Sequence, residues 1–168
     1  MNAKIIALAQ HLGLEFCKFG LNPEEEVYYE GISQENFDEK EEELLDNERY
    51  SREEINEILL KWLNEESTLL EDEINESKYD DCLFEYGSQE YLVCTDDEAD
   101  DKWEEDLDNY LEECIYPELE GNLKYYFDDE KWKGDAKRDG RGHSLNRYDG
   151  DEDSEQVDGE TYYIYRQN

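Results

Sequence analysis

Apolar residues recur with helical spacing in two stretches of the chain. In the first stretch they run from Ile55 to Ile74, and the pattern permits one long helix or two helices joined near Glu66. The second stretch carries its apolar residues on one predicted inner face, and Pro117 ends that helix or lies just past its end. These inner-face residues are Ala99, Trp103, Leu107, Tyr110, Leu111 and Cys114. Each helix is preceded by a capping-box sequence, at 51–54 and at 95–98.

Shorter runs between and after these helices have the composition of β-strands. Residues 82–86 and 90–95 flank Gly87-Ser88 and predict a hairpin. Residues 161–166 are rich in tyrosine and are expected to add to the same sheet. The glycine-containing, charged stretch 133–160 is expected to form irregular loops. The pattern therefore predicts an α+β fold in which acidic amphipathic helices pack on a small antiparallel sheet.

The length of 168 residues fits a single domain over 1–168. Within it, the pattern permits a helical N-terminal part (1–80) and an α+β C-terminal part (81–168).

Charge changes this picture more than any motif does. The chain holds 51 acidic and 16 basic residues, for a formal net charge of −35, and residues 23–130 alone hold 41 acidic against 7 basic groups. Aromatic residues make up 13% of the chain, which favours a folded protein over an acidic disordered one. Such a surface disfavours direct binding to nucleic acid or to an anionic membrane, and it favours basic proteins and metal cations.

The cysteines and the apolar segments bear on the compartment. Cys17, Cys82, Cys94 and Cys114 are widely spaced, as is typical of reduced, buried thiols. The stretch 5–14 is too short and too polar for a secretory leader, and no stretch is long enough to span a membrane. We therefore expect a cytoplasmic protein.

The carboxylates of the helices are spaced three and four residues apart. Neighbours at this spacing stand about 5–6 Å apart, and each like-charge pair costs the helix about 0.2–0.5 kcal/mol. Because folding alone gives no reason for this cost, we consider mimicry of nucleic-acid phosphates by residues 41–73 and 96–113. The candidate partner-binding residues are Glu53, Glu54, Glu57, Glu65, Glu66, Glu71, Asp72, Glu73, Asp97, Asp100, Asp101, Glu104, Glu105, Asp108 and Glu112.

The second half of the chain also carries sequence motifs. They lie at 90–100, at 140–145 (Gly-Arg-Gly-His-Ser-Leu), at 148–150 (Tyr-Asp-Gly) and at 162–166. Together they resemble a group of small acidic proteins from bacteriophages and mobile elements, over about 85–168. That group has no assigned chemistry, so the resemblance implies a phage context and carries over no functional residue. By composition the chain also resembles phage antirestriction and anti-CRISPR proteins that imitate DNA.

Other candidate chemistry is weak. Asp149, Asp151, Asp153 and Glu160 occupy four positions of an EF-hand loop, but Ser154 stands where that loop needs glycine. His143 beside Ser144 has no identifiable third group. No phosphate-binding loop is present, and no cofactor is expected.

A basic cluster follows the acidic block. It comprises Lys131, Lys133, Lys137, Arg138, Arg141 and Arg147. The cluster either neutralises the acidic helices within the chain, or docks on the target or on a second copy, giving a homodimer.

Three functions are left open by the sequence. The first is a non-enzymatic phage inhibitor that occludes the channel of a basic nucleic-acid-binding host protein, such as a restriction, CRISPR or other defence enzyme. The second is an accessory phage protein-binding module whose charge serves solubility. The third is a calcium-binding acidic protein.

Overall fold

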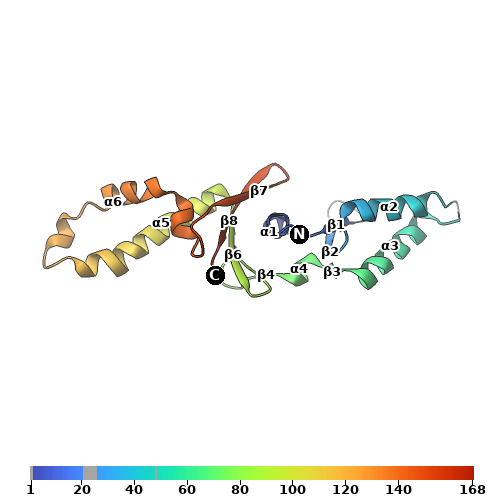
Figure 1. Cartoon of the computed structure of the whole chain (residues 1–168), viewed down its shortest axis with the longest axis horizontal. Helices are drawn as coiled ribbons and strands as arrows, with labels where there is room; N and C mark the ends of the chain where they lie inside the picture. The colour runs from blue at the N-terminus through green and yellow to red at the C-terminus, as the bar shows by residue number, and fades with distance from the viewer. Residues whose placement is uncertain (1, 21–25, 48) are drawn as a thin grey trace. The chain divides into compact units, whose positions relative to one another are not determined.

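The computed structural model describes residues 2–20, 26–47 and 49–168, and the chain divides into two compact units. Unit 1 is Met1–Glu76 and unit 2 is Ser77–Asn168. Each unit contains helices and an antiparallel sheet, so the predicted α+β class is confirmed (Figure 1). The boundary at 76/77 lies four residues before the one expected from sequence.

Unit 1 is built from a three-stranded sheet and four helices among its described residues. The sheet has the strand order β1-β2-β3 and is antiparallel. Its presence corrects the expectation that residues 1–80 are helical. The elements are α1 (Ala3–His11), β1 (Phe16–Phe19), β2 (Val27–Glu30), α2 (Gln34–Leu45), α3 (Arg52–Glu66), β3 (Thr68–Leu69), α4 (Leu70–Glu73) and β4 (Ile74–Glu76).

The apolar side of α3 explains how unit 1 is held together. Ile55, Leu59 and Leu63 are buried there with Phe37 of α2 and Cys17 of β1. The predicted capping box at Ser51 and Glu54 forms and starts the helix. At Ser67 the backbone becomes extended, and Thr68 and Leu69 then pair with β2. The long apolar stripe is therefore two helices, but a short strand separates them.

Unit 2 contains the predicted hairpin and the predicted third strand. Leu83–Tyr86 (β5) and Gln89–Cys94 (β6) pair across a turn at Gly87, whose φ of 63° suits a residue without a side chain. Glu160–Arg166 (β8) pairs with β6, and Asp153–Val157 (β7) pairs with β8, all antiparallel. These four strands lie in the order β5-β6-β8-β7.

The helices of unit 2 form a long excursion from this sheet. The helix α5 (Asp96–Tyr110) begins at the predicted Thr95 capping box and runs away from the sheet, and α6 (Asp129–Ala136) returns beside it (Figure 1). A π-helical turn, η2 (Leu111–Ile115), and two 3₁₀ turns, η3 (Tyr116–Glu118) and η4 (Leu123–Tyr126), join them. Pro117 lies in η3, beyond the end of α5.

The stretch 133–160 is more regular than expected. It contains the second half of α6, the short turn η5 (Lys137–Asp139), α7 (Arg141–Leu145) and β7. The sequence hid these elements because α6 and α7 are short, contain glycine and carry no clear apolar period.

The core of unit 2 lies between α5, α7 and the sheet. Ala99 and Tyr165 are fully buried in it, with Trp103 packed alongside. Two residues expected on the inner face of α5 are instead exposed, Tyr110 at 51% and Cys114. The helix has left the sheet by that point, so its inner side has no sheet to cover it.

The remaining thiols behave as expected. Cys17, Cys82 and Cys94 are buried, and none of them is in a disulfide among the described residues. Burial raises the pKa of Cys17 to about 11, which keeps this thiol protonated. In the described parts of the chain, no helix combines the length and the apolar character that crossing a membrane requires.

Candidate partner-binding surface

The fifteen candidate carboxylates fall on two separate surfaces, one in each unit. Glu53, Glu54, Glu57, Glu65 and Glu66 lie on α3, and the acids at 71–73 lie on α4. The other seven lie on α5 and at the start of η2. All fifteen are exposed except Glu104, which is half-buried.

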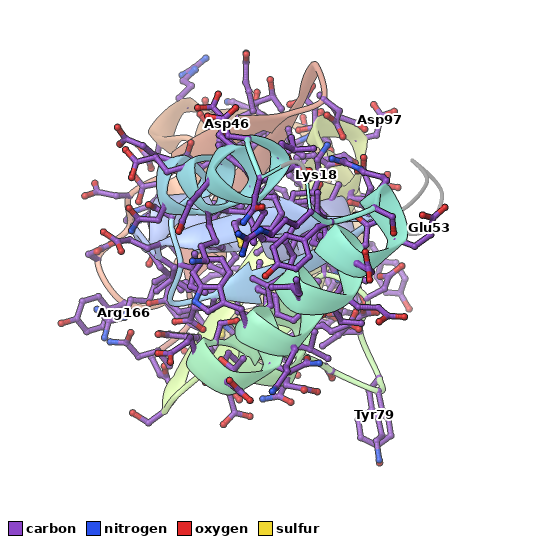
Figure 2. The ribbon with its side chains drawn as sticks, turned by 90° about the vertical axis from the view of Figure 1, so that its right-hand side faces the viewer. Lys18, Asp46, Glu53, Tyr79, Asp97 and Arg166 are labelled. Atoms are coloured by element: carbon purple, nitrogen blue, oxygen red, sulfur yellow. The ribbon has the colours of Figure 1, made fainter. Side chains whose placement is uncertain are left out.

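The α3 surface has few internal partners. Glu54 is used by the capping box, where it accepts a hydrogen bond from the Ser51 amide at 2.8 Å. Glu65 lies 3.8 Å from Lys61, and both side chains are well exposed. Glu53 projects from the first turn of α3 into solvent (Figure 2), and no ion pair joins it to another described residue.

The α5 surface is neutralised along one side by the basic cluster. Lys133 and Lys137 of the α6 region form ion pairs with Glu104, and Lys133 also pairs with Asp108. Lys124 reaches Glu112 at 3.5 Å. Four of the six cluster residues thus have intramolecular acidic partners, counting Arg138 with Asp135 and Arg141 with the acids described next. This matches the intramolecular alternative for the cluster.

Arg141 is the best-connected cation of unit 2. Its guanidinium lies 2.8 Å from Asp96, 3.1 Å from Asp100 and 3.1 Å from Glu152, and its side chain is only 12% exposed. It also lies over the ring of Tyr163 at 4.3 Å. Burial opposes the charge of Arg141, but the hydrogen bond to Asp96 and the neighbouring Glu152 outweigh it and raise its pKa.

Three candidate carboxylates of α5 are left without an ion pair among the described residues. They are Asp97, Asp101 and Glu105, which we call the α5 row. Positions four apart lie on one side of a helix, with a rise of about 6 Å between them. The α5 row is therefore an exposed line of three like charges that the fold does not neutralise.

The motifs behind the phage resemblance have a structural role. A Cβ atom on Gly142 would lie 2.6 Å from the backbone oxygen of Gly150, so the segments around 142 and 150 touch closely. The Asn146 amide donates to the oxygen of Asp151 at 2.8 Å, and Ser144 accepts a hydrogen bond from the Trp103 indole at 3.1 Å. These contacts fasten α7 to the loop that follows it and to α5.

The other candidate chemistry is not assembled by the fold. No hydrogen bond joins His143 to Ser144 in the described chain, and the Ser144 hydroxyl already accepts a hydrogen bond from the Trp103 indole. In the β7–β8 hairpin, Val157 faces Glu160 whereas Asp153 faces Ile164. That register separates Asp153 from Glu160 by four strand positions, about 13 Å, which is too far for one calcium ion. The structure therefore corrects the EF-hand candidate set of Asp149, Asp151, Asp153 and Glu160.

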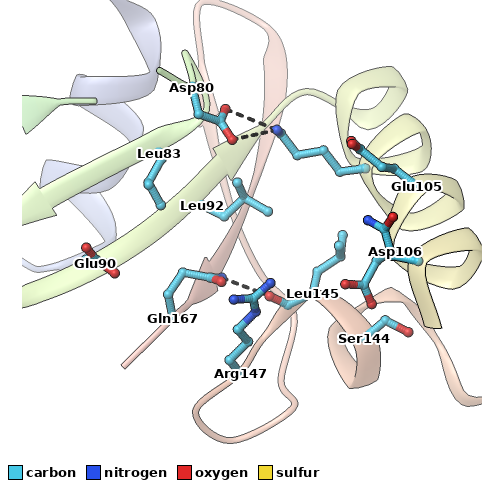
Figure 3. A pocket seen from close by; sticks show the side chains of 12 residues that line it. Asp80, Leu83, Glu90, Leu92, Glu105, Asp106, Ser144, Leu145, Arg147 and Gln167 are labelled. Atoms are coloured by element: carbon cyan, nitrogen blue, oxygen red, sulfur yellow. Dashed lines mark hydrogen bonds and ion pairs between the residues drawn. The ribbon is translucent and has the colours of Figure 1, made fainter. Parts of the chain in front are cut away.

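Unit 2 also has a cleft of about 350 Å³ between α5, α7 and the sheet (Figure 3). Leu83, Leu92 and Leu145 give it an apolar floor, and charged groups surround that floor. Asp80 and Lys102 bind each other at its edge, at 2.8 and 3.0 Å. Burial raises the pKa of Asp106 in this cleft, and Arg147 partly opposes the effect.

The sequence missed some candidate acids and the exposed aromatic residues. Glu35, Glu39 and Glu42 of α2 are exposed acids, without an ion pair among the described residues, that extend the surface of unit 1. Tyr125 and Tyr126 are 85% and 84% exposed. In the sequence, these adjacent tyrosines fit neither the helical nor the strand spacing of apolar residues, and this is the signal that indicates their exposure.

No protein-family model matches this sequence, and neither the curated proteins nor the solved structures contain a significant match to it.

Proposed function

We propose that this protein is a phage-type inhibitor that binds a basic nucleic-acid-handling protein of the host in place of nucleic acid. It acts by occluding the binding channel and not by catalysis, in the cytoplasm of the host cell. A restriction, CRISPR or other defence enzyme is the target class that fits the phage resemblance.

One observation carries this proposal. Lys133, Lys137 and Arg141 pair with acids that lie along one side of α5, at 96, 100, 104 and 108, and the α5 row has no ion pair among the described residues. Repulsion along such a row destabilises the helix. A basic partner would relieve that repulsion and would release the cations gathered around these carboxylates, as a basic protein does when it binds DNA.

The α3 surface supports the same function from the other unit. Its free acids at positions 53 and 57 are again four residues apart, and unit 1 holds 22 acidic against 6 basic residues. Either surface alone presents a group of uncompensated negative charges.

Capture from host extract at low salt, followed by elution in rising salt, tests the proposal. We expect a nucleic-acid-binding protein that elutes in a narrow salt window and that DNA displaces. The variant D97N/D101N/E105Q removes the α5 row and should lower the slope of log affinity against log salt by about two to three.

A matched control separates mimicry from general charge. The variant E85Q/D153N/D158N removes the same charge from exposed strand and turn positions without ion pairs, and Asn is well tolerated at the positive φ of Asp158. It should bind as the unaltered protein does. Equal loss in both triple variants, or a captured protein that DNA does not displace, would contradict the proposal. The variant E53Q/E57Q/E66Q then reports whether the α3 surface contributes.

A further inference from the structure

The far end of the α5–α6 pair presents bare aromatic side chains. We call residues 111–128 the tip, because α5 enters it and α6 leaves it (Figure 1). Tyr125 and Tyr126 are 85% and 84% exposed there, and Leu123 is 55% exposed. Two adjacent rings with this exposure form an apolar surface that the fold itself does not cover.

The tip is held in place by specific contacts, so its exposed rings are not the result of a loose chain. Tyr110 stacks on Trp132 with ring centres 5.7 Å apart, which joins α5 to α6 at the base of the tip. Tyr116 packs edge-on against Phe127, and Lys124 lies 3.7 Å from the centre of the Tyr116 ring. These four aromatic residues pack in pairs, whereas Tyr125 and Tyr126 are exposed over most of their surface.

The surroundings of the two rings are strongly acidic. Between positions 111 and 128 the chain holds five acidic residues and a single lysine, which is already bound to Glu112. The acids are Glu112, Glu113, Glu118, Glu120 and Asp128. A purely apolar partner would have to desolvate these carboxylates without replacing their hydrogen bonds, at a large cost. The complementary surface is therefore basic and also accommodates aromatic rings.

Surfaces with both properties occur in proteins that bind single-stranded nucleic acid. Their grooves combine cations that follow the backbone with side chains on which unpaired bases stack. A duplex-binding protein instead reads phosphates and the edges of stacked bases, and it has no socket for an unstacked ring. The tip and the α5 row together supply rings and a single line of charges.

We propose that the tip imitates a short stretch of single-stranded nucleic acid, in which Tyr125 and Tyr126 take the place of unstacked bases. The neighbouring carboxylates take the place of phosphates. The partner is a basic protein whose groove stacks bases. This inference rests on the proposed function and specifies its partner class.

Two competition assays test the inference with the full-length protein. In the first, an OB-fold single-stranded-DNA-binding protein carries fluorescein-labelled oligo(dT). In the second, a histone-like protein carries a labelled DNA duplex. We expect the unaltered protein to displace oligo(dT). The variant Y125A/Y126A should need a concentration at least about 10-fold higher for the same displacement, given the strength of base–aromatic stacking. Its duplex displacement should change less than about 2-fold, since duplex binding depends mainly on charge.

Two further variants control for side-chain chemistry and for exposure. Y125F/Y126F keeps both rings and should displace oligo(dT) like the unaltered chain. Y79A removes a tyrosine that is 98% exposed but lies outside the tip, and it should change neither assay. Circular dichroism checks that each variant remains folded.

The outcomes separate this inference from the proposed function. Displacement of the duplex alone overturns the single-strand inference and leaves mimicry standing. Displacement of neither probe overturns both. Displacement of oligo(dT) that is equally strong in Y125A/Y126A shows that the rings are not base mimics, and D97N/D101N/E105Q then reports whether charge alone explains it.

Discussion

The helices α3 and α5 are both 15 residues long, both start at a capping box and both carry many acids, yet they manage this charge differently. Around α3, the exposed Arg52 binds the half-buried Glu41 of α2, and Lys61 approaches Glu65 with both side chains exposed. Around α5, the well-buried side chains of Lys133 and Arg141 each contact at least two carboxylates.

The difference follows from what each helix packs against. The helix α3 lies on a sheet, and Leu59 and Leu63 are fully buried beneath it. That apolar contact stabilises α3 regardless of the charges on its exposed face. The helix α5 packs on its sheet through Ala99 and Trp103 and then runs away from it (Figure 1), and the region of α6 is joined to α5 by the ion pairs of Lys133 and Lys137 and by the stacking of Trp132 on Tyr110. The comparison teaches that Lys133 and Arg141 hold elements of unit 2 together, whereas the α5 row and Glu53 and Glu57 of α3 have no ion pair among the described residues.

Replacing Arg141 should give the largest effect. R141Q leaves the acids at 96, 100 and 152 close together without their shared cation, and the loss of these charge-assisted hydrogen bonds costs about 1.5–3 kcal/mol. The free energy of unfolding of unit 2, followed by Trp103 and Trp132 fluorescence in a W62F background during urea titration, should fall by that amount. R138Q is the control, because the Arg138 side chain is 80% exposed, and it should cost less than about 1 kcal/mol. Similar losses in the two variants would show that Arg141 has no special structural role.

The contact beneath α7 gives the next largest effect. In G142A the new methyl group meets the backbone oxygen of Gly150, which must move, and we expect a loss of about 1–3 kcal/mol in the same titration. G134A is a control of the same chemistry in open space within α6, and it should stabilise by about 0.5–1 kcal/mol because alanine favours helix. If G142A is as stable as the unaltered protein, the close contact between residue 142 and Gly150 does not hold α7 in place. Something other than this contact would then position Arg141.

The parts of the fold that the sequence predicted are those with strong local signals. The capping boxes at Ser51 and Thr95 begin their helices as expected, and the hairpin at Gly87 and the strand through Tyr163 pair as expected. Each depends on nearby residues, or on a composition that only one element type favours.

The parts that escaped prediction depend on distant contacts. The sheet of unit 1 is missed because its strands are only two to four residues long, and because β2 pairs with β3 across the whole of α2 and α3. The candidate carboxylates were located correctly on helix surfaces, but which of them are free depends on where Lys133, Lys137 and Arg141 fold back. No local pattern in 131–147 indicates that direction.

Removing the two lysines that join the α6 region to α5 should lower the free energy of unfolding more than removing two exposed lysines, one of them on α3. In K133Q/K137Q, the acids at 104 and 108 lose their partners, and since the Lys133 side chain is only 13% exposed we expect a loss of about 1–2 kcal/mol. The matched control K61Q/K78Q removes two exposed lysines and the same charge, and it should cost less than about 0.5 kcal/mol. Equal effects would mean that net charge matters and the placement of the lysines does not.

The smallest expected effect concerns Asp106, which faces the cleft of unit 2 from α5. Burial raises its pKa above that of the unfolded chain, so the folded state holds this proton more tightly. Between the two pKa values stability therefore falls as pH rises, and the penalty is fully present at pH 7 and absent below the ordinary carboxyl pKa of about 3.9. D106N should raise the melting temperature at pH 7 more than E57Q does, because E57Q only removes one exposed charge of α3. The advantage of D106N over E57Q should shrink as the pH is lowered toward 4. If D106N and E57Q give the same shift at every pH, the cleft does not penalise this carboxylate, and α5 differs from α3 only in the cations that bind it.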